Sequence, residues 1–352
     1  MSQQALPSPP LDDALVAPFR RLDTAVLGRV AADGWDLDVA SVRRLDTERD
    51  DTVVVTHAGG RHVLKVAHPL DDPVVLDLQC AALQHAARRD PDLPLPHVTP
   101  DRDGTPLRRV TGADGEPRLA RLLSHLDGEV LDYGATTPAQ RSAVGAAAGR
   151  LSLALADLEH PGADRVLAWD LRQVGTLRPL LGHVADPGAA LLVEAELDAY
   201  DDQLGEALHA VRQQVVHHDV NPDNVLVDRS SPEYVSGILD FGDVVRSSVV
   251  GDLAVAMSYA VATGTAADAD DPWSAPYDVA QGFRSVRDLT AEELELLPRL
   301  VRLRLAQRLL LNSWLASSDP GNAHYTGRSI ARAGTALRRL TETPSPVERE
   351  GA

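Results

Sequence analysis

The chain has 352 residues, of which 44% are hydrophobic and only 4% aromatic, so it can bury a large core filled mainly by Ala, Val and Leu. Its net charge of −18 excludes binding of nucleic acid through the overall electrostatic field. The longest charge-free apolar run, residues 253–267, is shorter than the about 18–20 residues that span a bilayer, and we expect no membrane partner.

The chain ends and the cysteine content indicate a cellular compartment. The first residues, MSQQALPSPPLDD, lack the basic and apolar regions of a signal peptide. The single cysteine, Cys80, cannot form an internal disulfide. A reduced, cytoplasmic location is therefore expected. Proline and charged residues with little apolar content also predict loose segments at residues 1–12 and 340–352.

The first third of the chain is predicted to be rich in strands. Residues 39–66 alternate apolar and polar runs, and Gly59-Gly60 between two apolar runs predicts a hairpin turn. Apolar residues at helical spacing predict one helix over residues 73–89, with Pro73 in its first turn. A second group of strands is expected over residues 107–123.

The remaining two thirds are predicted to be mainly helical. Helical spacing of apolar residues predicts helices over residues 140–159, 189–216, 253–262, 292–304 and 305–316. A β-rich region followed by a helical region is typical of an α+β protein with two lobes. We place the boundary at residues 119–128, between an N-lobe of residues 1–118 and a C-lobe of residues 129–339.

The most informative feature is the segment 215–243, VVHHDVNPDNVLVDRSSPEYVSGILDFGD. Its short apolar runs predict strand, loop, strand, turn and strand. Asp219 follows His217 by two positions, Asn224 comes five residues later, and Asp240-Phe241-Gly242 begins sixteen residues after Asn224. The arrangement suits phosphoryl transfer, because one carboxylate can meet a substrate hydroxyl while an amide oxygen and a second carboxylate hold Mg²⁺ on nucleotide phosphates.

The residue types in this segment indicate candidate roles. Asp219 is the candidate catalytic base, since a carboxylate within hydrogen-bond reach of the acceptor hydroxyl can take its proton. Asn224 and Asp240 are candidate Mg²⁺ ligands, because Mg²⁺ favours oxygen donors and keeps several waters. Asp223 competes as a ligand by position, but the spacing of the motif selects Asn224.

The same segment resembles the aminoglycoside phosphotransferase family, small-molecule kinases with a protein-kinase-like fold, and is most similar to its hydroxylysine-kinase branch and to kinase domains joined to class III aminotransferases. The resemblance implies a β-rich N-lobe that binds nucleotide and a helical C-lobe with the catalytic loop and the acceptor site. It extends over about residues 30–335 through the stretches LDTERDDTVVV (45–55), RHVLKVAHP (61–69), RLLSHLDGEVL (121–131), GRLSLALADLEHPGADRVLAWDL (149–171) and GDLAVAMSYA (251–260).

The resemblance also implies a lysine that binds the α- and β-phosphates. Lys65 matches it, in RHVLKV on a predicted strand. The following helix normally offers this lysine an acidic partner. Asp77 is the plausible match, with the neutral Gln79 as a rival. His217, in turn, is expected to pack and to hold the catalytic loop.

Two further regions are implied to contact the nucleotide. The linker between the lobes contacts the base through backbone groups, and Leu123 and Ser124 lie in it. The turn at residues 46–51 is acidic and free of glycine, so its phosphate contacts would come from backbone N–H groups and from Arg49.

We expect a small-molecule kinase that uses ATP or GTP with Mg²⁺ to phosphorylate a hydroxyl of a cationic, amine-bearing acceptor, with a hydroxylysine-like amino alcohol favoured. Acidic runs at residues 186–206 and 268–295 either attract such an acceptor or form a solvated surface. The competing interpretations are an aminoglycoside 3′-type O-phosphotransferase, a nucleotidyl transferase and a non-catalytic nucleotide-binding protein. The sequence does not distinguish ATP from GTP.

Overall fold

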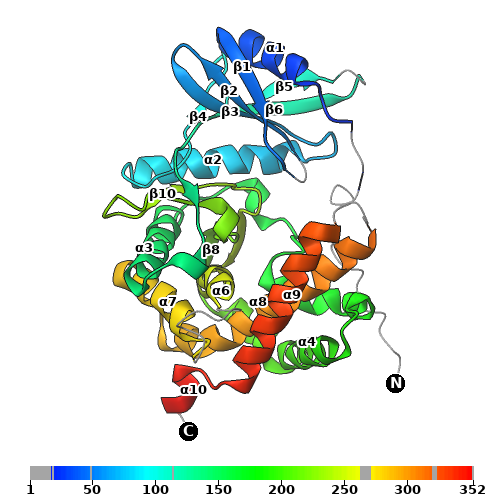
Figure 1. Ribbon diagram of the computed structural model, residues 1–352, viewed down its shortest axis with the longest axis vertical. Coiled ribbons are helices and arrows are strands. Elements are labelled where there is room, and N and C mark those ends of the chain that lie inside the picture. Colours follow the sequence, from blue (N-terminus) through cyan, green and yellow to red (C-terminus); the bar gives the residue numbers. More distant parts are fainter. Residues whose placement is uncertain are drawn as a thin grey trace.

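The computed structural model describes residues 17, 20–47, 50–112, 115–261, 271–318 and 323–350. Arg49 and the N-terminal segment 1–12, on which two of the expectations rest, lie outside the described residues. Across the described ranges, no helix has both the length and the apolar character needed to cross a membrane. Figure 1 shows a sheet at one end of the molecule and a larger helical region below it, as the α+β prediction requires.

The N-lobe is built on one antiparallel sheet with the strand order β1-β2-β3-β6-β4, and β5 also pairs with β6. Its strands are β1 (Val39–Arg44), β2 (Asp51–His57), β3 (Gly60–Val66), β4 (Val98–Thr99), β5 (Arg108–Thr111) and β6 (Pro117–Ser124). The predicted hairpin is confirmed: β2 and β3 pair from Asp51–Val66 to His57–Gly60. Gly60 adopts a φ of 126°, a conformation that favours glycine.

One face of this sheet packs against helix α1 (Thr24–Trp35). Val53, Val55 and Leu64 are fully buried in this interface together with Leu27 of α1. Because successive side chains of a strand point to opposite faces, burial of Leu64 beneath α1 turns Lys65 toward the C-lobe. The strand pattern thus decides which lobe the lysine faces.

Helix α2 (Pro73–Arg89) lies between the sheet and the C-lobe (Figure 1). It forms over the residues predicted for it, and its first turn is capped by Asp72, whose side chain accepts a hydrogen bond from Val74 N at 2.8 Å. Leu78 and Leu83 of α2 belong to the large hydrophobic core of the C-lobe.

The C-lobe is mainly helical. Its longer helices are α3 (Pro138–Ala154), α4 (Pro187–Ala199), α6 (Val249–Ala260), α7 (Ser274–Val286), α8 (Ala291–Ser318) and α9 (Ala323–Glu342). Shorter helical pieces are η2 (Tyr133–Ala135), η3 (Pro161–Asp164), η4 (Leu171–His183), η5 (Tyr200–Leu204), α5 (Gly205–Ala210), η6 (Pro222–Asn224) and α10 (Pro346–Glu350). Short strands carry the motif segment: β8 (Gln213–Val216), β9 (Val225–Val227), β10 (Val235–Ile238) and β11 (Val245–Ser248), with β7 (Glu129–Val130) beside β9.

Three boundaries differ from the prediction. Residues 292–316 form one helix, α8, which continues through Pro298. The helical run predicted over 189–216 ends at Ala210, and strand β8 follows. Residues 119–124, which we assigned to the linker, belong to strand β6, so residues 125–128 connect the lobes before β7.

The C-terminal segment 340–352 is not loose over its described part, residues 340–350, and this expectation was wrong. Helix α9 reaches Glu342 and α10 follows at Pro346. Leu340 is 1% exposed, and Trp273 Nε1 donates a hydrogen bond to the carbonyl oxygen of Thr343 at 2.8 Å. The tail is too short to show a hydrophobic period, and its order comes from this long-range contact.

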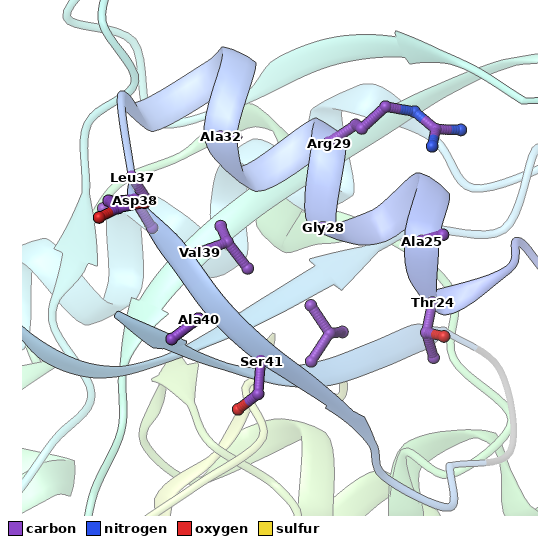
Figure 2. A pocket seen from close by; sticks show the side chains of 11 residues that line it. Thr24, Ala25, Gly28, Arg29, Ala32, Leu37, Asp38, Val39, Ala40 and Ser41 are labelled. Carbon is purple, nitrogen blue, oxygen red and sulfur yellow. The ribbon is translucent and has the colours of Figure 1, made fainter. Parts of the chain in front are cut away.

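An open hollow of about 560 Å³ lies between α1 and β1 on the N-lobe. Figure 2 shows that small side chains line it, among them Gly28 and Ala32 from the helix and Ser41 from the strand. All its lining residues lie between Thr24 and Val42, so it contains none of the predicted site residues.

Helices α3 and α7 lie so close together at Gly282 that a larger residue there should lower the stability of the protein. A Cβ atom on Gly282 would lie 1.8 Å from the carbonyl oxygen of Ser142. Gly282→Ala should therefore lower the free energy of unfolding by about 1–3 kcal/mol, the usual cost of overpacking. Chemical denaturation measures the change. Gly182→Ala is the control, because a Cβ there meets no atom within 4 Å; equal stability loss in both variants would contradict the prediction.

Candidate active site

The three short strands predicted from the apolar runs of the motif segment are present as β8, β9 and β10. Strand β8 pairs with β11, and β9 pairs with β10, all antiparallel. Val215 and Val216 of β8 are fully buried. The loop between β8 and β9, residues 217–224, is therefore held at both ends by core strands, and we call it the motif loop.

Asp219 is oriented by two amides of the motif loop. Asn221 Nδ2 donates to Asp219 Oδ1 at 2.9 Å, and Asn224 Nδ2 donates to Asp219 Oδ2 at 2.7 Å. The Asn221 side chain also accepts from Asp223 N and Asn224 N, which bends the loop back into η6. The Asp219 side chain keeps 22% of its surface exposed, so a small molecule can reach it.

Asp240 lies just after β10 in the left-handed conformation, with a φ of 53°. Aspartate tolerates this region, and Asp240 Oδ1 accepts a local hydrogen bond from Gly242 N at 3.0 Å. Its other oxygen, Oδ2, lies 3.4 Å from Lys65 Nζ of the N-lobe. The tertiary structure thus brings together Lys65 and Asp240, which are 175 positions apart.

The prediction that Asp77 is the acidic partner of Lys65 was wrong. Asp77 lies on the exposed side of α2 and pairs with His160, whose Nε2 is 3.2 Å from Asp77 Oδ2. Lys65 Nζ instead lies 3.4 Å from Asp50 Oδ2, in the turn before β2. The lysine therefore receives its second carboxylate from the sheet rather than from the helix.

Asp50 is in turn held by a buried arginine. Arg121 Nη2 of β6 donates to Asp50 Oδ2 at 3.2 Å and to Gln79 Oε1 of α2 at 2.8 Å. Arg121 is 4% exposed and Gln79 is 8% exposed. Gln79, the alternative to Asp77 in the sequence analysis, thus interacts with Lys65 only indirectly, through Arg121 and Asp50.

The pKa values of Asp240 and Asp219 are shifted in opposite directions. The Lys65 ammonium lowers the pKa of Asp240 to about 2. Burial raises the pKa of Asp219 well above its ordinary value, and the neighbouring charge of Asp243 adds to the rise, whereas Arg304 opposes it. Asp240 is thus held as an anion, and Asp219 is the more basic carboxylate of the pair.

Groups outside the motif loop hold its first residues, His217 and His218, in place. Asp252 Oδ1 accepts a hydrogen bond from His218 N at 2.7 Å, and Ser248 caps helix α6. His217 Nε2 lies 3.0 Å from the Leu239 carbonyl oxygen, and its ring packs edge-on against Phe241 at 4.8 Å. Burial lowers the pKa of His217 to about 4, which keeps the ring neutral and suits the packing role expected for it.

Leu123 and Ser124 lie at the end of β6, next to the connection between the lobes. Leu123 is 9% exposed and pairs with Val63 of β3 and Val98 of β4. Ser124 Oγ accepts a hydrogen bond from His97 N at 2.8 Å. The Ser124 hydroxyl therefore already has one partner within the N-lobe, and its O–H donor is not used by that contact.

Arg304 of α8 is a charged neighbour of Asp219 that the sequence analysis missed. Its Nη2 lies 3.9 Å from Asp219 Oδ1, and the guanidinium stacks over the ring of Trp169 with its carbon 5.0 Å from the ring centroid. The signal in the sequence was an arginine within the apolar repeat of a buried helix, since Arg304 is 1% exposed.

Several carboxylates of the acidic runs pair with arginines. In the first run, Arg178 pairs with Asp198 and Asp201, and Arg302 pairs with Glu196. Figure 1 shows α4, which carries much of this run, in the lower part of the molecule, away from the sheet. In the second run, Asp278 pairs with Arg141, and Asp268 and Asp270 lie outside the described residues. The paired charges favour the solvated-surface interpretation.

The oxygen donors beside Lys65 fit a hard divalent cation. The amide nitrogen of Asn224 donates to the carboxylate and to the backbone oxygen of Asp219, which leaves the amide oxygen Oδ1 as the free end of the side chain. The Asp240 side chain is 46% exposed and already anionic. One amide oxygen and one carboxylate are a sufficient protein contribution to a Mg²⁺ site.

Sequence comparison matches this chain to a protein family and to named relatives. The family model of the phosphotransferase enzyme family matches residues 41–292 of this chain. A hydroxylysine kinase of Danio rerio is 28% identical over 88% of this chain and 88% of its own length. The hydroxylysine kinase of Mus musculus is 28% identical over 61% of this chain, and the match spans only 58% of that enzyme. A homoserine kinase of Azorhizobium caulinodans is 29% identical over 69% of this chain and 71% of its own length.

Solved structures show the same architecture. An amicoumacin kinase superposes with a TM-score of 0.70 at 16% identity, over 93% of this chain and 96% of that chain. A microcompartment-associated aminopropanol kinase gives a TM-score of 0.63 at 22% identity, over 91% of this chain and 97% of that chain. These findings confirm the family resemblance read from the motifs. The chain therefore belongs to the phosphotransferase enzyme family and has its two-lobed, protein-kinase-like fold.

Proposed function

We propose that this protein is a small-molecule kinase that transfers the γ-phosphate of ATP or GTP to a hydroxyl of an amine-bearing acceptor. The observation that carries the proposal is the convergence of Lys65 from the N-lobe with Asp240 and the motif loop of the C-lobe. A cation suited to phosphate, an anionic oxygen donor and a basic carboxylate are thus brought close together. Those are the groups that phosphoryl transfer requires.

In this proposal each group has one task. Asp219 accepts the proton of the acceptor hydroxyl while the acceptor oxygen bonds to the γ-phosphorus and the bond to the β-phosphate oxygen breaks, which releases the nucleoside diphosphate. Lys65 binds the α- and β-phosphates. Asn224 and Asp240 would hold Mg²⁺, which when bound neutralises phosphate charge. An amicoumacin kinase of the same fold was solved with AMP-PNP and Ca²⁺, which supports a nucleotide and a divalent cation here.

The acceptor that we favour is a hydroxylysine-like amino alcohol. The supporting observation is that the relatives are named hydroxylysine and homoserine kinases, and that a structural neighbour is an aminopropanol kinase. All three names denote compounds with a hydroxyl and an amine. The test is a nucleotide-consumption screen of amino alcohols against aminoglycosides, with mass spectrometry of the product. A phosphorylated aminoglycoside as the preferred product would overturn the acceptor assignment.

The first prediction concerns the base. Asp219→Asn keeps the shape of the side chain but removes its ability to accept a proton. Turnover should fall on the order of 10²-fold or more, in line with general-base contributions. Nucleotide affinity should change little, because Asp219 faces the acceptor. Steady-state kinetics and a nucleotide titration check both parts, and turnover near the wild-type rate would rule out Asp219 as the base.

A second prediction concerns the metal. Asn224→Ala and Asp240→Ala each remove one proposed oxygen ligand, so each variant should lose the Mg²⁺-dependent part of nucleotide binding. Calorimetric titration of nucleotide with and without Mg²⁺ measures it. Asp223→Ala is the control, since Asp223 is the neighbouring carboxylate that the motif spacing rejects. Full metal dependence in the Asp240→Ala variant would place the metal elsewhere.

A third prediction separates the two possible partners of Lys65. Asp50→Asn removes the carboxylate that lies 3.4 Å from Lys65 Nζ. Nucleotide affinity should fall on the order of tenfold, as for loss of one hydrogen bond to a charged group. Asp77→Asn, in contrast, should leave nucleotide affinity unchanged, because Asp77 pairs with His160. The reverse order of effects would restore the helix carboxylate as the partner.

A further inference from the structure

The acceptor side of Asp219 contains a buried arginine that the proposed phosphoryl transfer does not use. Arg304 lies on α8 and is 1% exposed. The guanidinium is nevertheless beside the carboxylate that we propose as the base, with Nη2 3.9 Å from Asp219 Oδ1. A separation of 3.9 Å is longer than a hydrogen bond, so Nη2 of Arg304 can still donate a hydrogen bond to another group.

The guanidinium is held rigidly along its other edge. Arg304 Nη1 donates to the Trp169 carbonyl oxygen at 2.6 Å and to Gln307 Oε1 at 2.9 Å. Gln307 is itself fixed by donating to the carbonyl oxygens of Ala168 and Asp170 at 2.8 and 3.1 Å. The Trp169 ring supports the guanidinium face. The arginine is thus preorganised, with its plane and one of its edges fixed.

Two nitrogens of Arg304 remain without a hydrogen bond to any described residue. Nε is buried and has no hydrogen-bond partner. Nη2 makes only the long contact with Asp219. A buried arginine normally satisfies its donors, because an unpaired buried charge is costly. The unfilled donors are therefore next to the position where the acceptor hydroxyl must bind.

From this geometry we infer that Arg304 forms a carboxylate-binding subsite for the acceptor. Guanidinium binds carboxylates strongly through charge-assisted hydrogen bonds. An amine-bearing acceptor, as proposed above, with its hydroxyl at Asp219 and its carboxylate at Arg304 is an amino acid that carries a side-chain hydroxyl. Aminoglycosides and simple amino alcohols lack that carboxylate. The inference rests on the proposed kinase function and narrows its acceptor class to zwitterionic hydroxy amino acids.

The test compares matched acceptors that differ only in the carboxylate. 5-Hydroxylysine is measured against its carboxamide, and homoserine against 3-amino-1-propanol, its decarboxylated form. Wild-type kcat/KM should favour the carboxylate form on the order of 10- to 100-fold, the span of hydrogen bonds to charged groups. Arg304→Met should abolish that preference, lowering kcat/KM for the acid far more than for the carboxamide, so that the ratio of the two falls to about one. Arg304→Lys keeps the charge and should recover part of the preference.

The control variant is Arg299→Met, which removes a partly exposed cation from the same helix and should leave the preference intact. If the wild type uses acid and carboxamide equally, the subsite is refuted while the kinase proposal stands. If Arg304→Met slows both acceptors equally, Arg304 supports the loop and binds no carboxylate. If neither acceptor is phosphorylated, calorimetric binding of 5-hydroxylysine and its carboxamide to the wild type decides the subsite: preferred binding of the acid supports it, and equal or absent binding overturns it.

Discussion

The ion pair between Lys65 and Asp240 is the contact on which the site depends. It joins the sheet of the N-lobe to the motif segment of the C-lobe, with 3.4 Å between Nζ and Oδ2. Neither residue could be placed there by local structure alone. Burial of Leu64 beneath α1 turns the lysine toward the C-lobe, and the left-handed backbone at Asp240 turns the carboxylate toward the lysine. The proposed nucleotide site lies where these two constraints meet.

Around that pair, the protein distributes negative charge unevenly. Asp50 and Asp240 both lie 3.4 Å from Lys65, and Arg121 adds a second cation behind Asp50. Asp219 lies in a less cationic environment, where burial and the charges of Asp243 and Asp240 raise its pKa, and Arg304 and the hydrogen bond from Asn221 oppose the rise. A metal ligand must stay anionic, whereas a general base must be able to accept a proton. Different surroundings allow two carboxylates in one small site to take these two roles.

The acceptor side is organised by helix α8 and the segment 168–171. The buried side chains Arg304 and Gln307 bind three successive carbonyl oxygens of that segment, and His218 Nε2 lies 3.1 Å from the Trp169 carbonyl oxygen. The proposed carboxylate subsite and the support of the motif loop therefore share one network. Several carboxylates of the acidic runs, in contrast, pair with arginines such as Arg178 and Arg302.

The sequence by itself determined the features that depend on local spacing. The motif of Asp219, Asn224 and Asp240, the strand that carries Lys65, the helix over residues 73–89 and the two-lobed α+β class all follow from periods and short motifs. Only the tertiary structure decided that Asp50 rather than Asp77 meets Lys65, that Arg304 lies beside Asp219, and that the tail packs against Trp273. Each of these joins residues distant in the chain, and a single sequence records the spacing of neighbours but not which distant side chains share a buried volume.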